Sequence, residues 1–460
     1  KMSLKKDLTK VFSANFLQFL IGLVNSFFVP AFLGLDQYAY LKTFTLYLSY
    51  VGIFHFGFID GIYIKYGGKQ KNTINVLELN YEYKFLLTFQ SFVTLIFFLA
   101  GLIKKDIILL AFSLSIIPVN MQTFFSFLFQ ALGELSLYSQ IKILFPILTL
   151  FLNLFVIFVL KINNYIPFVI SYLIAYYISF LFFEFEYIKL LNTKNVGIDR
   201  NINEIKKLFS IGIFVMLGNL STMFVYSLDR WFVKFLLTVE DFAYYSFAVS
   251  MMSIINLLIS ATATVFYPYL ARGYTKELIK ELKKYLLIIG AISSFGYFAL
   301  SFVVKIFLKK YNPSLSVISI LFAGFPAISV INVLYVNLYK IDRKERKYFK
   351  TVLLMVIISF VLNLIAVLIN KSNQSIALAT TISFYIWFFW SSKDFNGLGA
   401  NKKEILFLSL YLPLFFISTL YLDLLSGSVL FGLGVSFLLF IFYKNEIISL
   451  LKIILKNNPN

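Results

Sequence analysis

The sequence is short of the residue types that carry most soluble chemistry. Its 460 residues contain no cysteine and a single histidine, His55, which excludes disulfides, thiolate metal sites and a nucleophilic thiol. Only 14% of the residues are charged, compared with about 25% in soluble domains. The segments between apolar runs are too short to form a nucleotide-binding or catalytic domain, and no phosphate-binding glycine loop is present. We therefore expect no enzymatic activity, no cofactor and no bound metal.

Apolar residues dominate the chain. They make up 60% of it, and the mean hydropathy is +0.84. A helix needs about 17 to 25 such residues to cross about 30 Å of hydrocarbon. We expect an all-α integral membrane protein with about fourteen transmembrane helices. They are predicted near residues 11–33, 40–63, 85–103, 107–130, 143–160, 166–188, 208–235, 243–270, 285–307, 315–339, 351–369, 375–392, 404–422 and 428–443.

Lysine and arginine are distributed unevenly between alternate loops. With the N-terminus inside, 31 of the 41 Lys and Arg residues fall on the inner side, where positively charged loops are retained. Both termini are therefore predicted to be cytoplasmic. The net charge of +19 could indicate nucleic-acid binding. Its placement in alternate loops favours topology and attraction to anionic membrane lipids instead, so we expect no nucleic-acid partner.

The sequence repeats itself at an offset of 204 residues. Residues 27–43 (FFVPAFLGLDQYAYLKT) align without a gap with residues 231–247 (WFVKFLLTVEDFAYYSF), and five of the 17 pairs are identical. A second register, of 210 residues, pairs residues 152–154 with residues 362–364. Six predicted helices separate each copy from its partner. Because six is even, both copies cross the membrane in the same direction, and parallel repeats of this kind place a transport site between the halves near mid-bilayer.

These repeats set the expected domain organisation. Two parallel six-helix bundles surround a central cavity, and two extra C-terminal helices fall outside the duplication. The predicted boundaries are 1–190 for the N-terminal bundle, 191–207 for a cytoplasmic linker, 208–392 for the C-terminal bundle, 404–443 for the two additional helices and 444–460 for a cytoplasmic tail.

Polar residues recur on one face of predicted helices one and seven. Their spacing in helix one follows the helical period, and helix seven repeats it at the 204-residue offset. Two interpretations are open: helix–helix hydrogen bonds, worth about 0.6 to 2 kcal/mol each, or the wall of a wet cavity, which the doubled face favours. A polar stripe on helix eight either lines the same cavity or packs closely. The predicted cavity-lining residues are Asn15, Gln18, Asn25, Asn219, Thr222, Tyr226 and Asn256.

Asp229, Arg230 and Lys234 carry the sharpest signal of a binding site. An arginine costs about 2.5 to 3.5 kcal/mol at the centre of a spanning helix. Arg230 and Lys234 are four residues apart, on one helical face, and form a cationic patch suited to phosphate, because the arginine fork binds two oxygens at once. Alternatively, both side chains snorkel to the outer headgroups. Asp229 either pairs with a neighbouring cation or carries a coupling ion.

Four residues outside helix seven are further candidates. Asp60 and Lys65 close helix two at its cytoplasmic end, where Lys65 meets an entering lipid phosphate or is an ordinary interfacial charge. Asp60 and His55 are candidates for ion coupling, although a lone histidine also packs as a neutral core residue. Lys305, at the outer end of helix nine, opposes the positive-inside trend and indicates an outer anionic surface or a substrate phosphate.

Four segments resemble one family of membrane transporters. They are LDRWFVKFLLTVEDFAYYSFAVS (Leu228–Ser250), FLGLDQYAYL around Leu33–Leu41, HFGFIDGIYIKYGG around Asp60 and NLIAVLINKSNQSIALATTIS (Asn363–Ser383). In this order they resemble the polysaccharide flippases, the O-antigen and capsule repeat-unit group of the multidrug/oligosaccharidyl-lipid/polysaccharide (MOP) exporter superfamily. The Asp-Arg pair of helix seven and the Ala-Thr pair of helix twelve are the more specific features.

The resemblance implies a function and partners. The family carries an undecaprenyl-diphosphate-linked oligosaccharide from the inner to the outer leaflet of the bacterial inner (cytoplasmic) membrane by alternating access, for assembly of lipopolysaccharide O-antigen, capsule or exopolysaccharide. The implied partners are this substrate, membrane lipids, and polymerase and chain-length proteins of the same pathway. The family often has more cavity arginines than this chain, so Lys65 and Lys305 are expected to share the binding of phosphate with Arg230 and Lys234.

Three alternatives come from other classes. A cation-coupled multidrug exporter of the same superfamily would have the same repeat, but it usually has an acidic cavity, whereas the helix-seven charges are net positive. A twelve-helix facilitator is disfavoured by helices thirteen and fourteen. A glycan polymerase or glycosyltransferase needs a large outer loop, and no outer loop here is long enough.

Overall fold

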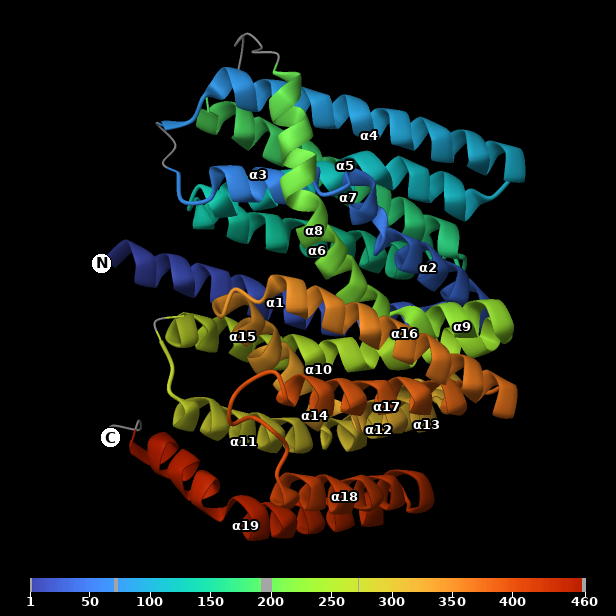
Figure 1. Ribbon diagram of the computed structural model, residues 1–460. Coiled ribbons are helices and arrows are strands. Elements are labelled where there is room, and N and C mark those ends of the chain that lie inside the picture. The colour runs from blue at the N-terminus through green and yellow to red at the C-terminus, as the bar shows by residue number, and fades with distance from the viewer. Residues whose placement is uncertain (1, 70–72, 192–200, 272, 457–460) are drawn as a thin grey trace. The chain divides into compact units, whose positions relative to one another are not determined.

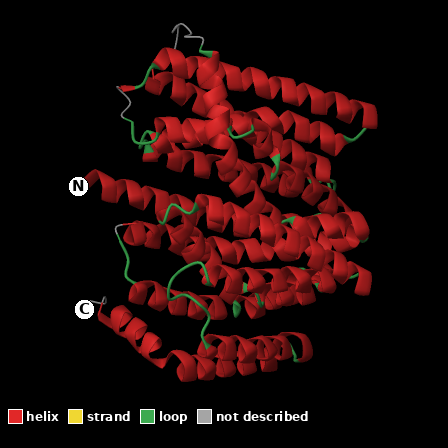
Figure 2. Cartoon of the chain, in the orientation of Figure 1, coloured by secondary structure: helices red, strands yellow, loops and turns green. Residues whose placement is uncertain are grey.

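Helices make up the described chain, with short connections between them (Figure 2). The computed structural model describes residues 2–69, 73–191, 201–271 and 273–456, with the side chains of 2–12, 15, 260–269, 271, 345 and 449–456 left out. Contacts between the helices divide the chain into two compact units, Lys1–Leu220 and Ser221–Asn460, called unit 1 and unit 2 below.

The spanning helices follow the predicted order. Eleven described helices are long and apolar enough to cross a membrane, or up to 13 if each of two bent helix pairs counts as one span. Helix α1 adds a shorter apolar stretch over Phe16–Phe32. The chain is therefore an all-α, multi-pass membrane protein, as its composition predicts.

Unit 1 contains the first six spans and the beginning of the seventh. In Figure 1, α4 and α5 run side by side, and α6 and α7 pack against α5. The elements are α1 (Met2–Phe32), α2 (Leu35–Leu48), a 3-10 turn (Val51–His55), α3 (Phe58–Tyr66), α4 (Val76–Lys104), α5 (Ile107–Ala131), α6 (Leu135–Phe155) with a π turn (Val156–Leu160), α7 (Tyr165–Leu191) and α8 (Ile202–Val225), which continues into unit 2.

Unit 2 contains the remaining spans. Its central span, α13 to α15, is buried along almost its whole length. The elements are α9 (Leu228–Leu236), α10 (Val239–Ala271), α11 (Lys276–Ser293), α12 (Gly296–Phe307), a 3-10 turn (Lys309–Tyr311), α13 (Ser314–Phe322), α14 (Phe325–Val330), a π turn (Ile331–Tyr335), α15 (Val336–Ile341), α16 (Glu345–Ile369), α17 (Asn373–Ser392), α18 (Lys402–Phe416) with a π turn (Ile417–Tyr421), and α19 (Leu424–Lys456).

The 204-residue repeat appears in the helix ends. Helix α1 ends at Phe32 and α9 ends at Leu236, while α2 begins at Leu35 and α10 begins at Val239. Both pairs of positions are 204 residues apart. The packing order also recurs, because the contacts α1–α6, α5–α7 and α6–α7 in unit 1 correspond to α9–α16, α13–α17 and α16–α17 in unit 2. The predicted domain boundaries stay a prediction, since residues 192–200 of the linker lie outside the described residues.

The second span is broken, although the sequence predicted one helix over 40–63. The chain bends by 61° between the 3-10 turn and α3, because Phe56 and Gly57 adopt left-handed conformations with φ of 47° and 82°. Breaking a helix leaves carbonyls without donors. Gln90 Nε2 donates to Phe54 O at 3.0 Å, and Asn120 Nδ2 donates to Val51 O at 3.3 Å. Two buried amides therefore hold the break open.

The tenth span is broken as well, although one helix over 315–339 was predicted. The bend of 47° follows Phe322, and Pro326 supplies the reason, because its ring nitrogen has no hydrogen to donate to the carbonyl four residues earlier. That carbonyl, Phe322 O, accepts from Ser294 Oγ at 2.9 Å. Thr381 and Tyr385 donate to two neighbouring carbonyls of the same span. Hydroxyl groups thus replace the missing backbone bonds.

The seventh span breaks near the predicted site, although one helix over 208–235 was expected. Helix α8 ends at Val225, and Ser227, with φ of −134° and ψ of −6°, separates it from α9. The buried Ser227 Oγ donates back to Met223 O at 2.7 Å, a bond that competes with the helix and bends it. The break makes α9 a separate nine-residue helix that begins with Leu228-Asp229-Arg230.

Candidate functional site

Helix α9 brings together the three charged residues predicted on the seventh span. Asp229 lies in its first turn, where exposed N–H groups favour a carboxylate. The Asp229 side chain is 3% exposed. Its Oδ2 accepts from Tyr245 Oη and its Oδ1 from the Arg230 backbone N–H, both at 2.7 Å. Hydrogen bonds within unit 2 therefore hold the carboxylate, and ion coupling through it stays a prediction.

Arg230 and Lys234 lie on the same side of α9, one turn apart. Arg230 is half-buried, and its Nε is fully covered without a hydrogen-bond acceptor among the described residues. The ammonium of Lys234 lies 5.6 Å from the centre of the Phe242 ring. A covered guanidinium N–H without an acceptor costs free energy unless an anion or water supplies one. This pair is the part of the site that is chemically prepared for an anionic group.

Three residues of the predicted polar face hold helices together. Asn25 Oδ1 accepts from Asn153 Nδ2 at 3.1 Å, which joins α1 to α6. Thr222 Oγ1 and Tyr348 Oη lie 2.8 Å apart, and Tyr226 Oη donates to Asn332 Oδ1 at 2.7 Å. For these three, the structure gives the helix–helix hydrogen bonds of the first interpretation.

Three other residues of that face have no hydrogen bond of this kind among the described residues. Asn219 is exposed, whereas Gln18 and Asn256 are half-buried, and the covered Oδ1 of Asn256 meets no donor. The side chain of Asn15 lies outside the described residues. A cavity wall at these positions stays a prediction.

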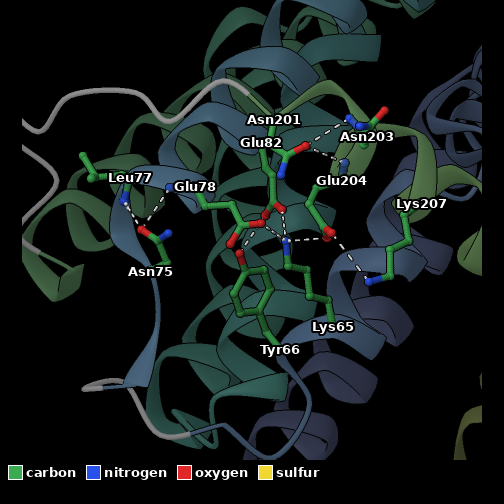
Figure 3. Close-up of polar contacts among 10 residues, drawn as sticks. All are labelled: Lys65, Tyr66, Asn75, Leu77, Glu78, Glu82, Asn201, Asn203, Glu204 and Lys207. Carbon is green, nitrogen blue, oxygen red and sulfur yellow. Dashed lines mark hydrogen bonds and ion pairs between the residues drawn. The ribbon is translucent and has the colours of Figure 1, made fainter.

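Lys65 is enclosed by carboxylates (Figure 3). Its Nζ lies 2.8 Å from Glu78, 2.5 Å from Glu82 and 3.4 Å from Glu204. Tyr66 Oη donates to the second oxygen of Glu82 at 2.8 Å. The Glu82 side chain is buried, and carboxylate groups need such partners when water is excluded. Lys65 therefore joins α3, α4 and α8, and its role toward a phosphate stays a prediction.

The sequence reasoning did not identify the carboxylates of this cluster. Glu78 and Glu82 are four residues apart on α4, so they share one face, and Glu82 precedes a long apolar run. A buried charge at the entrance to a span was the signal that could have found them. Their partner Lys65 was identified without its contacts.

His55 and Asp60 lie on opposite sides of the break in the second span. Both are buried, and His55 Nδ1 is 3.9 Å from Asp60 Oδ2. The two residues predicted separately as ion-coupling candidates are thus neighbours within unit 1. Lys305, by contrast, is exposed in the last turn of α12. No contact between Lys305 and Arg230 or Lys234 is found among the described residues.

A second buried ion pair was missed. Lys283 Nζ lies 2.7 Å from Glu404 Oε2 and donates to Leu398 O at 2.8 Å. Tyr411 Oη of α18 also donates to Ser294 Oγ at 2.6 Å. Helix α18, which follows the sequence repeat, is therefore bonded into unit 2 through α11.

Comparisons with known proteins show which solved structures have a similar fold. No family model and no curated protein matches the sequence. Among solved structures, the chain is similar to "Lipid II flippase MurJ, inward closed conformation", with a TM-score of 0.69 and 17% identity over 95% of this chain and 99% of that chain. It is also similar to the MATE multidrug transporter DinF-BH, with a TM-score of 0.58 and 15% identity over 84% of this chain and 93% of that chain.

One of these structures is a lipid flippase and the other a multidrug transporter. The identities are low, so the likeness concerns the fold and leaves the substrate to be argued from residues. The match to the lipid II flippase covers nearly the full length of both chains. The chain therefore shares its overall fold with these two solved structures.

Proposed function

We propose that this protein is a flippase that carries an undecaprenyl-diphosphate-linked oligosaccharide from the inner to the outer leaflet of the bacterial cytoplasmic membrane. The observation that supports it most directly is the α9 patch, in which the covered Nε of Arg230 has no described acceptor and Lys234 lies one turn away. A diphosphate supplies the oxygens that such a patch binds. The fold shared with a lipid II flippase agrees with a lipid-linked substrate.

The substrate has three parts that need different surroundings. Its diphosphate binds Arg230 and Lys234, with Lys65 and Lys305 as further cationic positions along its path. Its glycan is solvated by polar residues such as Gln18, and its polyprenyl tail stays in the lipid. In this proposal the protein moves the substrate by alternating access, with both termini in the cytoplasm and with polymerase and chain-length proteins using the product.

Energy coupling is part of the proposal. The negative charge of a translocated diphosphate must be balanced or driven across the membrane, and the buried carboxylates Asp60 and Asp229 with His55 are the coupling candidates. Ionisable groups within spanning segments are costly, so a functional role is their default interpretation.

The Arg230→Ala variant tests the binding role. A hydrogen bond to a charged group contributes about 1.5 to 3 kcal/mol, so we expect surface glycan display in cells to fall about ten- to a hundredfold while folded protein stays at its normal level. Arg346→Ala is the matched control, because Arg346 is exposed on α16 and its loss should leave display unchanged. Normal display by Arg230→Ala at a normal protein level would contradict the assignment.

A cation-coupled multidrug exporter is the second candidate. The likeness to a multidrug transporter favours it, and the buried Asp229 could bind a coupling cation in either case. The two functions differ in cargo. Vesicles containing the purified protein would expel a cationic dye if this candidate is right, whereas the flippase proposal expects no dye movement above that of empty vesicles.

A further inference from the structure

The break in the second span brings a histidine and a carboxylate together in the interior of unit 1. His55 ends the 3-10 turn and is 5% exposed; Asp60 lies in the first turn of α3 and is 4% exposed. Between them, Phe56 and Gly57 turn the chain through left-handed conformations. A continuous helix would place residues 55 and 60 on different parts of its surface, so the break itself creates this pair.

The hydrogen bond of His55 defines where its proton is. The Gly57 backbone N–H donates to His55 Nδ1 at 3.2 Å. A ring nitrogen that accepts a hydrogen bond carries no proton, so the imidazole is neutral with its hydrogen on Nε2. The distance of 3.9 Å between Nδ1 and Asp60 Oδ2 is beyond hydrogen-bond range. In this state Nδ1 accepts a hydrogen bond from the Gly57 N–H and makes no hydrogen bond to Asp60.

Adding a proton to Nδ1 reverses these relations. Nδ1 becomes a donor and can no longer accept from the Gly57 N–H, because two donors would face each other. Asp60 Oδ2, 3.9 Å away, is the carboxylate oxygen beside it, and the new imidazolium and an ionised carboxylate attract strongly where water is scarce. A shift of about 1 Å would form this bond. Proton uptake thus exchanges one partner of Nδ1 for another.

Gly57 transmits this exchange to α8. A Cβ on Gly57 would lie 2.4 Å from Ile213 N, and a Cβ on Gly212 would lie 1.8 Å from Gly57 O. The two backbones are therefore in direct contact without side chains between them. On the other side of the break, Gln90 and the carbonyl of Phe54 are already bonded. A change at Gly57 is for this reason expected to move α8 rather than α4.

Among the described residues, no other charged group competes for the proton at this place. Helix α5, which packs against the break, has no ionisable side chain. On α4 and α8, the carboxylates of the Lys65 cluster are bonded to that lysine, which is more than one turn along α3 from Asp60. The remaining charged side chains on these elements are Asp36 and Lys42 of α2, and four exposed lysines, Lys84 and Lys104 of α4 and Lys206 and Lys207 of α8.

We propose that His55 and Asp60 form one proton-binding site, and that a proton on His55 Nδ1 moves the imidazole from Gly57 to Asp60 and so changes the packing of α3 against α8. This inference deepens the proposed function, on which its role in transport rests, by naming the proton as the coupling ion and these two residues as its site. Because α8 is the helix that continues into unit 2, the proton-dependent contact lies on the chain segment that links the units.

The single histidine makes a direct test possible. Full-length protein with isotope-labelled histidine and a histidine-free tag, in lipid nanodiscs without substrate, gives imidazole nitrogen signals from His55 alone. We expect a neutral ring with its hydrogen on Nε2 at pH 8 and a doubly protonated ring at the acid end of a titration from pH 8 down to about pH 3, because burial disfavours the charged ring. A ring that keeps one form over this whole range would overturn the proposal.

Asp60→Asn tests the partner. Removing the carboxylate should weaken proton binding by His55 about tenfold, which lowers the midpoint by about one pH unit. Asp36→Asn, which removes a carboxylate at the start of the same span, is the control and should leave the midpoint unchanged. An unchanged midpoint in Asp60→Asn would overturn the pairing. If Asp60→Asn does not fold, the titration of the natural protein still decides whether a proton binds.

A distance measurement tests the movement. Ile64 and Phe214 are exposed, on α3 and α8, and the cysteine-free chain allows spin labels at Ile64→Cys and Phe214→Cys alone. We expect the distance between the labels to change with pH, and to stop changing when His55→Gln is added. An equal change in both proteins would overturn the proposal. Both measurements are made without substrate. Their results therefore do not depend on whether the protein flips a lipid, so a failure of this proposal can be told apart from a failure of the proposed function.

Discussion

The two copies of the repeated segment have helix ends at equivalent positions and differ in charge. In unit 1, α1 is one helix, and the neutral Asn25 bonds to Asn153. In the second copy, the equivalent stretch is broken into α8 and α9, and Asp229 takes the place of Asn25, with Arg230 after it. The helix ends still coincide at the 204-residue offset. The duplication thus kept the boundary between these two helices and varied the polar residues before it. On the proposed function, the residues that bind the substrate belong to the second copy.

A double substitution would remove this difference. Asp229→Asn with Arg230→Ser gives the second copy the residues of the first. We expect substrate flipping to fall about a hundredfold, because the cationic group that binds the diphosphate is lost, at about 1.5 to 3 kcal/mol for each charged contact. Flipping in reconstituted vesicles measures it.

The reciprocal change is its control. Ser26→Arg places an arginine in the first copy, and it should not restore flipping to the double variant. Full flipping by the Asp229→Asn/Arg230→Ser protein would remove the basis for assigning the site to the second copy.

Substitution of Lys65 tests whether its ion pairs hold the first part of α8 against α3 and α4. Lys65→Met leaves the buried Glu82 without its cation, and breaking a buried pair costs about 3 to 5 kcal/mol. Lys207→Met is the control, because Lys207 is 62% exposed and 3.6 Å from Glu204, so it should cost less than about 1 kcal/mol. Thermal inactivation in detergent compares the two variants, and equal losses would contradict the cluster in Figure 3.

Gly212 and Gly218 form a matched pair on α8. Gly212→Ala places a methyl group against Gly57 and should destabilise unit 1 by about 1 to 3 kcal/mol. A Cβ on Gly218 meets no heavy atom within 4 Å, so Gly218→Ala should be neutral or gain up to about 1 kcal/mol from helix propensity. The order of the two melting temperatures is the readout. A Gly212→Ala protein as stable as Gly218→Ala would show that α3 and α8 are not in backbone contact.

Tyr226 should have the smallest effect. It lies at the break that α1 lacks, and Tyr226→Phe removes its bond to Asn332, which we expect to cost about 0.5 to 1.5 kcal/mol. Tyr421→Phe, at an 81% exposed position, should cost nothing measurable. A difference below the error of the thermal inactivation assay would mean that this bond does not hold the break.

The spans and the repeat could be predicted because they follow from apolar length and helix count. The breaks could not, since nothing local marks Phe56 for a left-handed conformation, and the amide of Gln90 that supports it comes from another helix. Pro326 is itself a local signal for the break in the tenth span. It was not used, because the apolar run around it is long enough for one continuous spanning helix. Partners were equally beyond sequence: Lys65 was identified, but only the fold brings Glu82 and Glu204 to it.

The most direct test of the central claim is a flipping assay with the purified full-length protein. Vesicles would contain a polyprenyl-diphosphate-linked oligosaccharide with a fluorescent label, and a quencher added outside would report how much of it reaches the other leaflet. The account predicts transfer well above that of protein-free vesicles, reduced about ten- to a hundredfold by Arg230→Ala. Transfer equal to that of protein-free vesicles, or unchanged in Arg230→Ala, would contradict it.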